Sequence, residues 1–286
     1  MPRNVARRDL CFVSMTQLVT GLFCLTLGAS VSLAQTRVEP VKTTAPKAAP
    51  EIQPAADESH PLYVPLQMAH KALEPLSDIQ DYECVFTKRE LIGKKLVKTS
   101  MKLKFRDEPF SVYLKFIDTN AGREVLYVKG QNNNNLLVRE AGIKALVGVV
   151  TLSPTGPDAM AENRHPVSSI GMKEMLNTVI KQWEAEAKLA GTRTQKRPDS
   201  KLSTGEICTV YESVHEKLNK DFKFHTTRLW IDDKSGLAIG VQQLGFPGKN
   251  DKEPPLVEEY FYSDLKLNRK LTDADFDKSN KSYSFR

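Results

Sequence analysis

The sequence predicts an α+β protein built on a large antiparallel sheet with one covered face. Two series of strands are separated by one long amphipathic helix, an order typical of α+β folds. A side-chain period of two places one set of residues on a buried face and the other set in water. This period is clearest in residues 99–130, where the alternating apolar residues are Met101, Leu103, Phe105, Phe110, Val112, Leu114 and Phe116.

The chain of 286 residues begins with a segment that predicts export. Three arginines precede an apolar run over residues 10–27, and Ser32-Leu33-Ala34 places small side chains where a signal peptidase reads. We therefore expect residues 1–34 to be a cleaved signal peptide and the chain to reach the periplasm or cell envelope. After cleavage no membrane span would remain. The alternative is an uncleaved anchor close to the membrane, because the apolar run is long for a signal.

Residues 35–61 have the composition of a disordered linker. Pro, Ala, Thr, Lys and Glu dominate this segment, and such a composition does not bury enough apolar surface to fold. We expect residues 62–286 to form a single folded domain.

The folded part is predicted to begin with an amphipathic helix over residues 62–78, which Pro75 should end or kink. Five strands follow over residues 81–139. Short polar or glycine-containing segments separate these strands, among them Gly93-Lys94-Lys95 and Asn120-Ala121-Gly122. Sequential strands with short turns predict a meander of spatial neighbours.

The centre of the chain is less regular. Residues 143–152 are apolar and fit either a helix or a strand, and residues 153–167 predict a long loop of the kind that binds or covers something. A helix capped by Ser168 or Ser169 should then run to about Leu189. Its apolar stripe consists of Met172, Met175, Leu176, Val179, Ile180 and Trp183.

Four further strands are predicted over residues 205–215, 222–232, 237–246 and 256–267. Residues 192–203 are polar and basic, and we interpret them as a surface loop. Residues 271–285 are expected to be an ordered tail anchored by Phe276 and Phe285. The prediction amounts to about nine strands and two long helices.

Two cysteines, Cys84 and Cys208, remain after removal of the signal. The oxidising space outside the cytoplasm favours a disulfide between them, and the alternative is a pair of buried free thiols. The net charge of +6 comes with basic residues scattered through the strands rather than clustered. This pattern argues against a nucleic-acid partner.

No motif in the sequence specifies a reaction. A Gly-x-Ser-x-Gly elbow, a glycine-rich phosphate loop, a Cys-x-x-Cys pair and zinc-type spacings are all missing, so we expect no cofactor and no metal. Arg164 and His165 lie in the long loop, where they could contact an anion or act as a base, or could order the loop. Arg123 could contact a ligand head group or form a salt bridge at a rim, and Glu124 must point to the opposite face.

Several segments together resemble a known family. Tyr82-x-Cys84-x-Phe86-x-Lys88-Arg89 follows the first helix, and Glu259-Tyr260-Phe261-Tyr262-Ser263-Asp264-Leu265 lies near the end. The arrangement resembles the periplasmic lipoprotein-carrier (LolA/LolB-like) superfamily. Within it, the chain resembles an uncharacterised branch of exported bacterial proteins over residues 62–286. The marks of that branch are Lys104-Phe105-Arg106-x-x-Pro109-Phe110-x-Val112-Tyr113, Asn120-Ala121-Gly122-Arg123-Glu124-Val125 and Gly156-Pro157-x-Ala159-Met160.

The resemblance implies a curved antiparallel sheet that forms an incomplete (half) β-barrel, with helices covering its concave side over an apolar cavity. The function it implies is that of an exported, non-enzymatic binding protein that shelters a hydrophobic ligand, such as a lipid or a lipoprotein acyl chain. The rim or loop candidates are Arg123, Arg164 and His165. The candidates for the ligand wall are Phe105, Phe110, Val112, Leu114, Phe116, Met172, Met175, Leu176, Val179 and Trp183.

Two alternatives stay open. The same apolar residues would fill a solid core if the protein were a structural module of the envelope that binds a protein partner. The less favoured alternative is a hydrolase that uses His165 together with Arg164.

Overall fold

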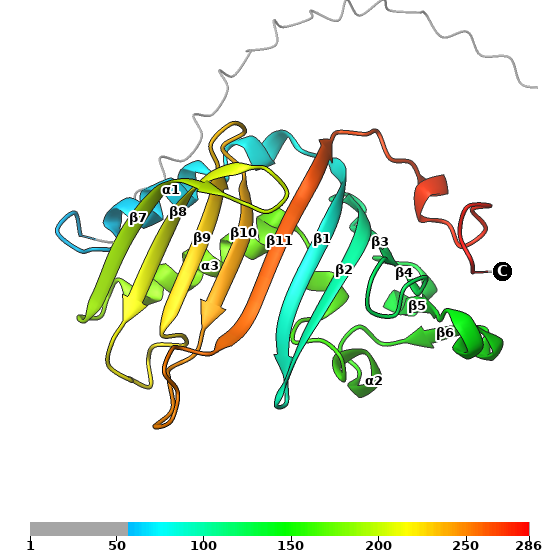
Figure 1. The fold of residues 1–286 in the computed structure, drawn as a ribbon. Helices are drawn as coiled ribbons and strands as arrows, with labels where there is room; N and C mark the ends of the chain where they lie inside the picture. The colour runs from blue at the N-terminus through cyan, green and yellow to red at the C-terminus, as the bar shows by residue number, and fades with distance from the viewer. Residues whose placement is uncertain (1–56, 286) are drawn as a thin grey trace, which may run out of the picture. The chain divides into compact units, whose positions relative to one another are not determined.

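A computed structural model describes residues 57–285, and an eleven-stranded antiparallel sheet dominates it (Figure 1). The strand order is β6-β5-β4-β3-β2-β1-β11-β10-β9-β8-β7. Among the described residues, β6 and β7 each pair with a strand on one side only, so the sheet is open, as predicted for an incomplete barrel. The predicted signal peptide and most of the predicted linker lie outside the described residues. Within residues 57–285, no helix is long and apolar enough to cross a membrane.

The first half of the sheet is a meander of six sequential neighbours. Its strands are joined by short turns, and the first turn is the predicted hairpin at Gly93, whose φ of 61° suits glycine. The strands are β1 (Asp81–Ile92), β2 (Lys95–Arg106), β3 (Ser111–Phe116), β4 (Glu124–Val128), β5 (Leu136–Arg139) and β6 (Val149–Leu152).

The second half is a meander of five strands, and it follows the central helix α3 (Met172–Glu186). Its strands are β7 (Thr192–Lys201), β8 (Ile207–His215), β9 (Thr226–Asp232), β10 (Ala238–Leu244) and β11 (Leu256–Leu267). The last strand pairs with the first, since β11 runs antiparallel to β1 from Tyr82 opposite Leu267 to Glu90 opposite Glu258. This pairing joins the two meanders into one sheet.

The inner face of the sheet packs against α1 (Tyr63–Lys71) and α3, and it carries the main apolar core. Two tyrosine hydroxyls of the sheet hold the start of α3. The backbone N–H of Gly171 donates to Tyr262 at 3.1 Å, and that of Met172 donates to Tyr82 at 3.2 Å. The predicted serine cap is therefore wrong. The helix begins later, at Met172, because the sheet satisfies the N–H groups that a serine would have satisfied.

The outer face of the sheet carries a second, smaller core. Tyr113, Leu126 and Leu137 point outward from β3, β4 and β5, and the C-terminal tail covers them. The ring of Tyr283 stacks on Tyr113 with centroids 3.9 Å apart, and Phe276 and Phe285 are buried beside it. In Figure 1 this tail runs from the end of β11 back along the β3–β5 half of the sheet. The prediction of an ordered tail anchored by two phenylalanines is confirmed.

The predicted first helix is broken where Pro75 suggested. It consists of α1 followed by a short 3-10 helix, η1 (Pro75–Asp78). The ambiguous segment over residues 143–152 divides in the same way, into the 3-10 helix η3 (Gly142–Val147) and the edge strand β6. The long loop that follows contains a single helical turn, α2 (Pro157–Met160), and a 3-10 turn, η4 (Val167–Ser169).

The predicted polar loop over residues 192–203 is wrong, because most of this segment is the edge strand β7. Its side chains lack an apolar period, and Pro198 interrupts it at a register shift between Arg197 and Ser200. Backbone hydrogen bonds to β8 rather than apolar burial hold this strand. An edge strand tolerates both proline and a charged surface.

The predicted disulfide is also wrong, since Cys84 and Cys208 are both free and buried. They lie on β1 and β8, and three strands of the sheet separate these two. Neighbouring strands are about 4.8 Å apart, so the two Cα atoms are far beyond the ~7 Å that a disulfide spans. Burial raises the pKa of the Cys208 thiol to about 12, and it also raises the pKa of Cys84.

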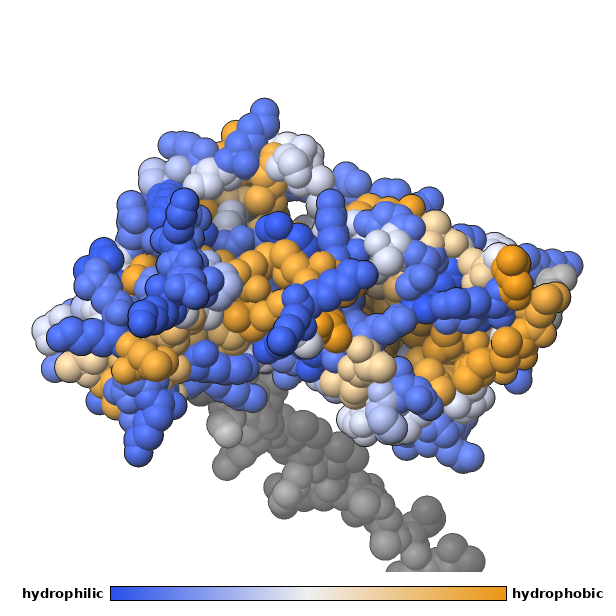
Figure 2. Space-filling model, turned by 60° about the horizontal axis from the view of Figure 1, so that its bottom comes forward, coloured by the Kyte–Doolittle hydropathy of each residue, from blue (hydrophilic) through white to orange (hydrophobic). Residues whose placement is uncertain are grey.

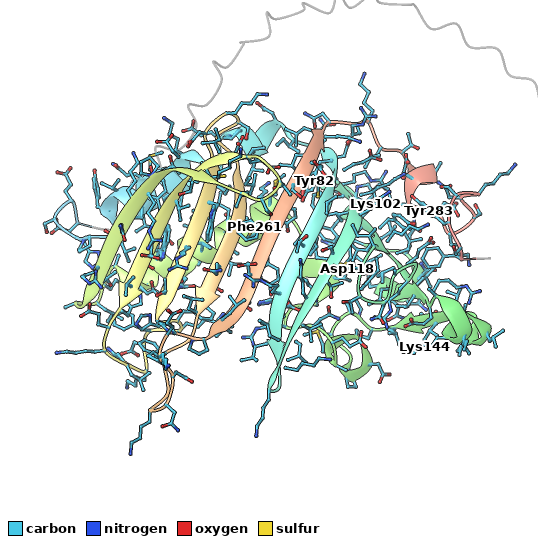
Figure 3. All side chains as sticks on the ribbon, in the orientation of Figure 1. Tyr82, Lys102, Asp118, Lys144, Phe261 and Tyr283 are labelled. Atoms are coloured by element: carbon cyan, nitrogen blue, oxygen red, sulfur yellow. The ribbon has the colours of Figure 1, made fainter. Side chains whose placement is uncertain are left out.

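One glycine on the outer face is covered by an aromatic ring. Gly240 on β10 lies opposite Phe261 on β11, and Figure 3 labels this phenylalanine on the sheet. The ring lies over the glycine so closely that a Cβ atom at residue 240 would be 2.2 Å from the phenyl Cε1 atom. Phe261 also meets Trp230 of β9 edge to face, with centroids 5.1 Å apart. An aromatic side chain thus fills the space that the missing glycine side chain leaves.

We predict that Gly240→Ala destabilises the protein by about 1–3 kcal/mol, because the new methyl group overlaps the ring of Phe261. Without this ring, alanine would stabilise a strand relative to glycine. Urea unfolding of both single variants and of the double variant with Phe261→Ala gives the coupling energy. The explanation fails if Gly240→Ala costs as much in the Phe261→Ala background as in the wild type.

A candidate ligand-binding cavity

A cavity of about 480 Å³ lies on the inner face of the sheet, between β1–β6, β10, β11, α3 and the loop over residues 153–170. This volume falls within the range of small-molecule sites. Figure 2 shows apolar surface lying between polar margins on the face of the molecule that it presents. The apolar residues of the cavity wall include Phe86, Met101, Leu114, Phe116, Val125, Leu136, Val138, Leu152, Met175, Val179, Val241 and Tyr262.

The strand period explains why these residues share one face. Register places Leu114 of β3 opposite Val125 of β4, and Val125 opposite Val138 of β5. Directly opposed residues point to the same side of a sheet, so this row forms one band of the wall. Met175 and Val179 are four residues apart on α3 and face the band from the helix.

Polar groups gather at another part of the same cavity. The buried Nζ atom of Lys88 donates to the Oε2 atom of Glu90 at 2.5 Å and also to Asn163. The hydroxyl of Tyr260 donates to the Oε1 atom of Glu90 at 2.6 Å. Burial, with the charges of Glu258 and Glu90, raises the pKa of Tyr260, so this phenol keeps its proton and remains a donor.

Glu258 is the second buried carboxylate of this cluster, and β1–β11 register places it directly opposite Glu90. Its Oε2 atom accepts hydrogen bonds from the Nε atom of Arg164 at 2.7 Å and from the Nε2 atom of His165 at 3.0 Å. Burial alone would raise the pKa of Glu258, but His165 and Arg164 outweigh burial and lower it below its ordinary value. The carboxylate is therefore ionised at neutral pH.

A third group of charges lies at the rim. Arg123, at the start of β4, contacts Glu140 at 2.9 Å and Glu162 at 2.6 Å. Burial lowers the pKa of Arg123, but its hydrogen bonds to Glu162 and Glu140 raise it overall. Glu124 is buried on the other side of the sheet, where it accepts a hydrogen bond from the backbone N–H of Ser284 at 2.7 Å. This confirms that neighbouring residues of the strand face opposite ways.

These contacts fasten one segment across the cavity, and we call residues 153–167 the lid. Glu162, Asn163, Arg164 and His165 are four consecutive lid residues. Each of them pairs with a charged residue of the sheet: Glu162 with Arg123, Asn163 with Lys88, and both Arg164 and His165 with Glu258. The lid is held by polar contacts, whereas the walls below it are apolar.

The predicted ligand-wall residues divide into two groups. Leu114, Phe116, Met175 and Val179 line the cavity. The others pack inside the protein: Phe105 stacks on Tyr82 with centroids 4.8 Å apart, and Trp183 donates to Ser213 at 3.0 Å. The remaining members of this second group are Phe110, Val112, Met172 and Leu176, and all of them belong to or pack against the main core.

Of the predicted rim residues, Arg123 and His165 line the cavity, and Arg164 lies behind Glu258. Four lining residues were not predicted from the sequence, namely Lys88, Glu90, Glu258 and Tyr260. A signal for two of them was present, because Lys88 and Glu90 continue the inward period of Tyr82, Cys84 and Phe86 along β1. Within residues 57–285, no group of three His, Cys, Asp or Glu residues is placed to hold a metal ion.

Residues 79–285 match the family described as protein of unknown function (DUF1571), and the chain belongs to that family. No curated protein matches the chain in sequence.

Three solved structures illustrate what the fold is similar to. A DUF1329 family protein from Desulfovibrio piger is 13% identical, with a TM-score of 0.35 over 77% of this chain and 98% of that chain. The Mycobacterium tuberculosis lipoprotein LppX is 13% identical, with a TM-score of 0.41 over 72% and 96%. A LolA superfamily protein from Nitrosomonas europaea is 12% identical, with a TM-score of 0.31 over 74% and 96%.

We predict that Glu258→Gln destabilises the protein by about 1–3 kcal/mol at pH 7, because Arg164 and His165 lose their shared anion. The folded-state pKa of Glu258 is lowered, so its contribution is present above the unfolded pKa and disappears as the pH falls through the folded pKa. The difference between wild type and variant should therefore shrink below about pH 4. Urea unfolding at several pH values checks this, and a difference that stays constant down to pH 3 contradicts it.

Proposed function

We propose that the protein is an exported, non-enzymatic binding protein that shelters the hydrophobic chain of an amphiphile, such as a lipid or a lipoprotein acyl chain. The observation that carries the proposal is the cavity of about 480 Å³, with apolar walls and a polar lid. A solid core would not leave such a space, so the cavity favours a binding protein over a structural module. Removing an alkyl chain from water supplies about 25 cal/mol per Å² of buried apolar area, before the cost of ordering.

The arrangement around His165 favours binding over hydrolysis. A hydrolase of the Ser–His type needs a nucleophile hydrogen-bonded to the imidazole. The Nε2 atom of His165 instead contacts Glu258, and Arg164 binds the same oxygen. Among the described residues, no serine, threonine or cysteine shares a hydrogen bond with His165. Its contacts are those of a residue that fastens the lid.

The cavity also suggests which head group the ligand carries. Its lining includes six carboxylates, namely Glu90, Glu140, Asp158, Glu162, Glu174 and Glu258. The cations Lys88 and Arg123 in the lining, and Arg164 behind it, are all engaged by carboxylates. The excess of negative charge in the lining would repel an anionic head group. It would attract an amine, and it would not repel a neutral polar group. We therefore favour a cationic or neutral amphiphile.

We predict that Val138→Trp strongly weakens ligand binding, because the indole occupies space beside the apolar wall of the cavity. Calorimetric titration with dodecyl maltoside below its micelle concentration should show at least about tenfold weaker binding than for the wild type. Val64→Trp is the matched control, since this valine is exposed on α1 and does not line the cavity. Native mass spectrometry of the gently purified protein should in turn show a lipid adduct that Val138→Trp lacks.

Equal binding by Val138→Trp and Val64→Trp would contradict the assignment of the site. A wild-type chain that binds no amphiphile and never carries lipid would overturn the proposed function.

The head-group preference is tested with two amphiphiles of equal chain length. At low salt, we expect dodecyltrimethylammonium to bind at least about ten times more tightly than dodecyl sulfate. This difference in affinity should shrink in high salt. Asp158→Asn with Glu174→Gln should narrow the difference, because both are exposed carboxylates of the lining. Asp199→Asn with Glu253→Gln is the matched control away from the cavity. Tighter binding of dodecyl sulfate would contradict the preference without affecting the proposed cavity.

A further inference from the structure

Three aliphatic side chains project into solvent beside the cavity, and we call them the apolar tip. Ile143 is 88% exposed, Leu146 is 89% exposed and Val147 is 73% exposed. All three belong to η3, which Figure 1 shows at the β6 end of the sheet. The corresponding end of the molecule is orange in Figure 2. Singly exposed apolar residues are common, but such a group within one short helix indicates an interaction site.

The sequence builds this tip as an ordered structure. Two glycines with positive φ, Gly142 at 61° and Gly148 at 82°, bracket the 3-10 helix. Side chains three residues apart eclipse in a 3-10 helix, so Ile143 and Leu146 lie on the same side. Arg139 fixes the segment from behind, because its guanidinium donates to the backbone carbonyls of Ala145 and, at 3.0 Å, of Ser284. The exposed side chains are therefore held outward.

The tip is continuous with the cavity. Glu140 precedes η3 and lines the cavity, and Leu152 and Pro154 follow it and also line the cavity. The edge strand β6 connects these two parts, and its first residue, Val149, is 37% exposed. β6 pairs only with β5, so its outer edge is free among the described residues. The chain segments on both sides of η3 therefore reach the cavity.

We propose that the apolar tip inserts into the surface of a lipid bilayer and so positions the cavity to take up or deliver its amphiphile there. Lys144 is exposed between the aliphatic side chains, where its cation would face lipid head groups while the aliphatic groups enter the acyl region. A second copy of the chain is a poorer occupant, because a stable protein interface buries about 800 Å² on each partner and three side chains supply much less. A bilayer needs no matching shape.

The test is a polarity-sensitive fluorophore, NBD, attached at Leu146→Cys in the full-length chain with Cys11→Ser and Cys24→Ser. Cys84 and Cys208 are buried and react poorly with the label because burial raises their pKa. Vesicles of phosphatidylcholine and phosphatidylglycerol should shift the emission to shorter wavelength. The matched control is the label at Leu218→Cys, since Leu218 is 77% exposed but lies between β8 and β9. Both labelled chains carry the same N-terminal region, so the comparison of the two labels isolates the response of the tip.

The control label should show no shift. Adding Ile143→Ser to the chain labelled at Leu146→Cys should raise the vesicle concentration needed for half of the shift by about tenfold, because a buried aliphatic side chain is lost. The proposal is overturned if the label at residue 146 does not respond to vesicles, or if both labels respond equally. It is also overturned if the shift appears without vesicles and grows with protein concentration, which would identify a second copy as the occupant. The outcome is independent of the titrations with soluble amphiphiles.

Discussion

The pairing of β1 with β11 is the interaction on which the rest of the structure depends. It joins the two meanders into one sheet, and its register sets Glu90 directly opposite Glu258 on the inner face. Two buried carboxylates in this position repel each other and need cations close by. Lys88 supplies one from the same strand, and Arg164 supplies another from the lid, where the Nε2 atom of His165 also contacts Glu258. The two carboxylates of the sheet therefore need positive charge nearby, and Arg164 of the lid supplies part of it.

The same arrangement divides the cavity by chemistry. Apolar side chains from the strands and from α3 form its walls, whereas its lid is fastened through Arg123, Lys88 and Glu258. Lys88, Arg123 and Glu258 are all buried, so water does not readily replace the contacts that fasten the lid. The exposed tip at η3 connects β5 and β6, two strands that border the cavity.

Much of the fold was predictable because its signals are local. The alternation of residues 99–130 indicated which side chains share a face, and Pro75 indicated a break that the structure has. The alternation did not indicate which of these side chains line the cavity and which are covered by other side chains. Phe105 of β2 and Leu114 of β3 lie on the same face of the sheet, yet Phe105 stacks against Tyr82 and Leu114 lines the cavity. The segment over residues 192–203 was misassigned because β8 supplies its hydrogen bonds and its own side chains show no apolar period.

By itself, the sequence determined the antiparallel α+β class, the inward and outward parity of the strands, the interrupted first helix and the anchored tail. Each of these follows from residues that are neighbours along the chain. The tertiary structure alone decided that Lys88 and Glu90 meet Glu258 and Tyr260, and that Cys84 and Cys208 stay apart. It also decided that tyrosines of the sheet start α3. These outcomes depend on which distant strands pair and in which register, and no local pattern carries that information.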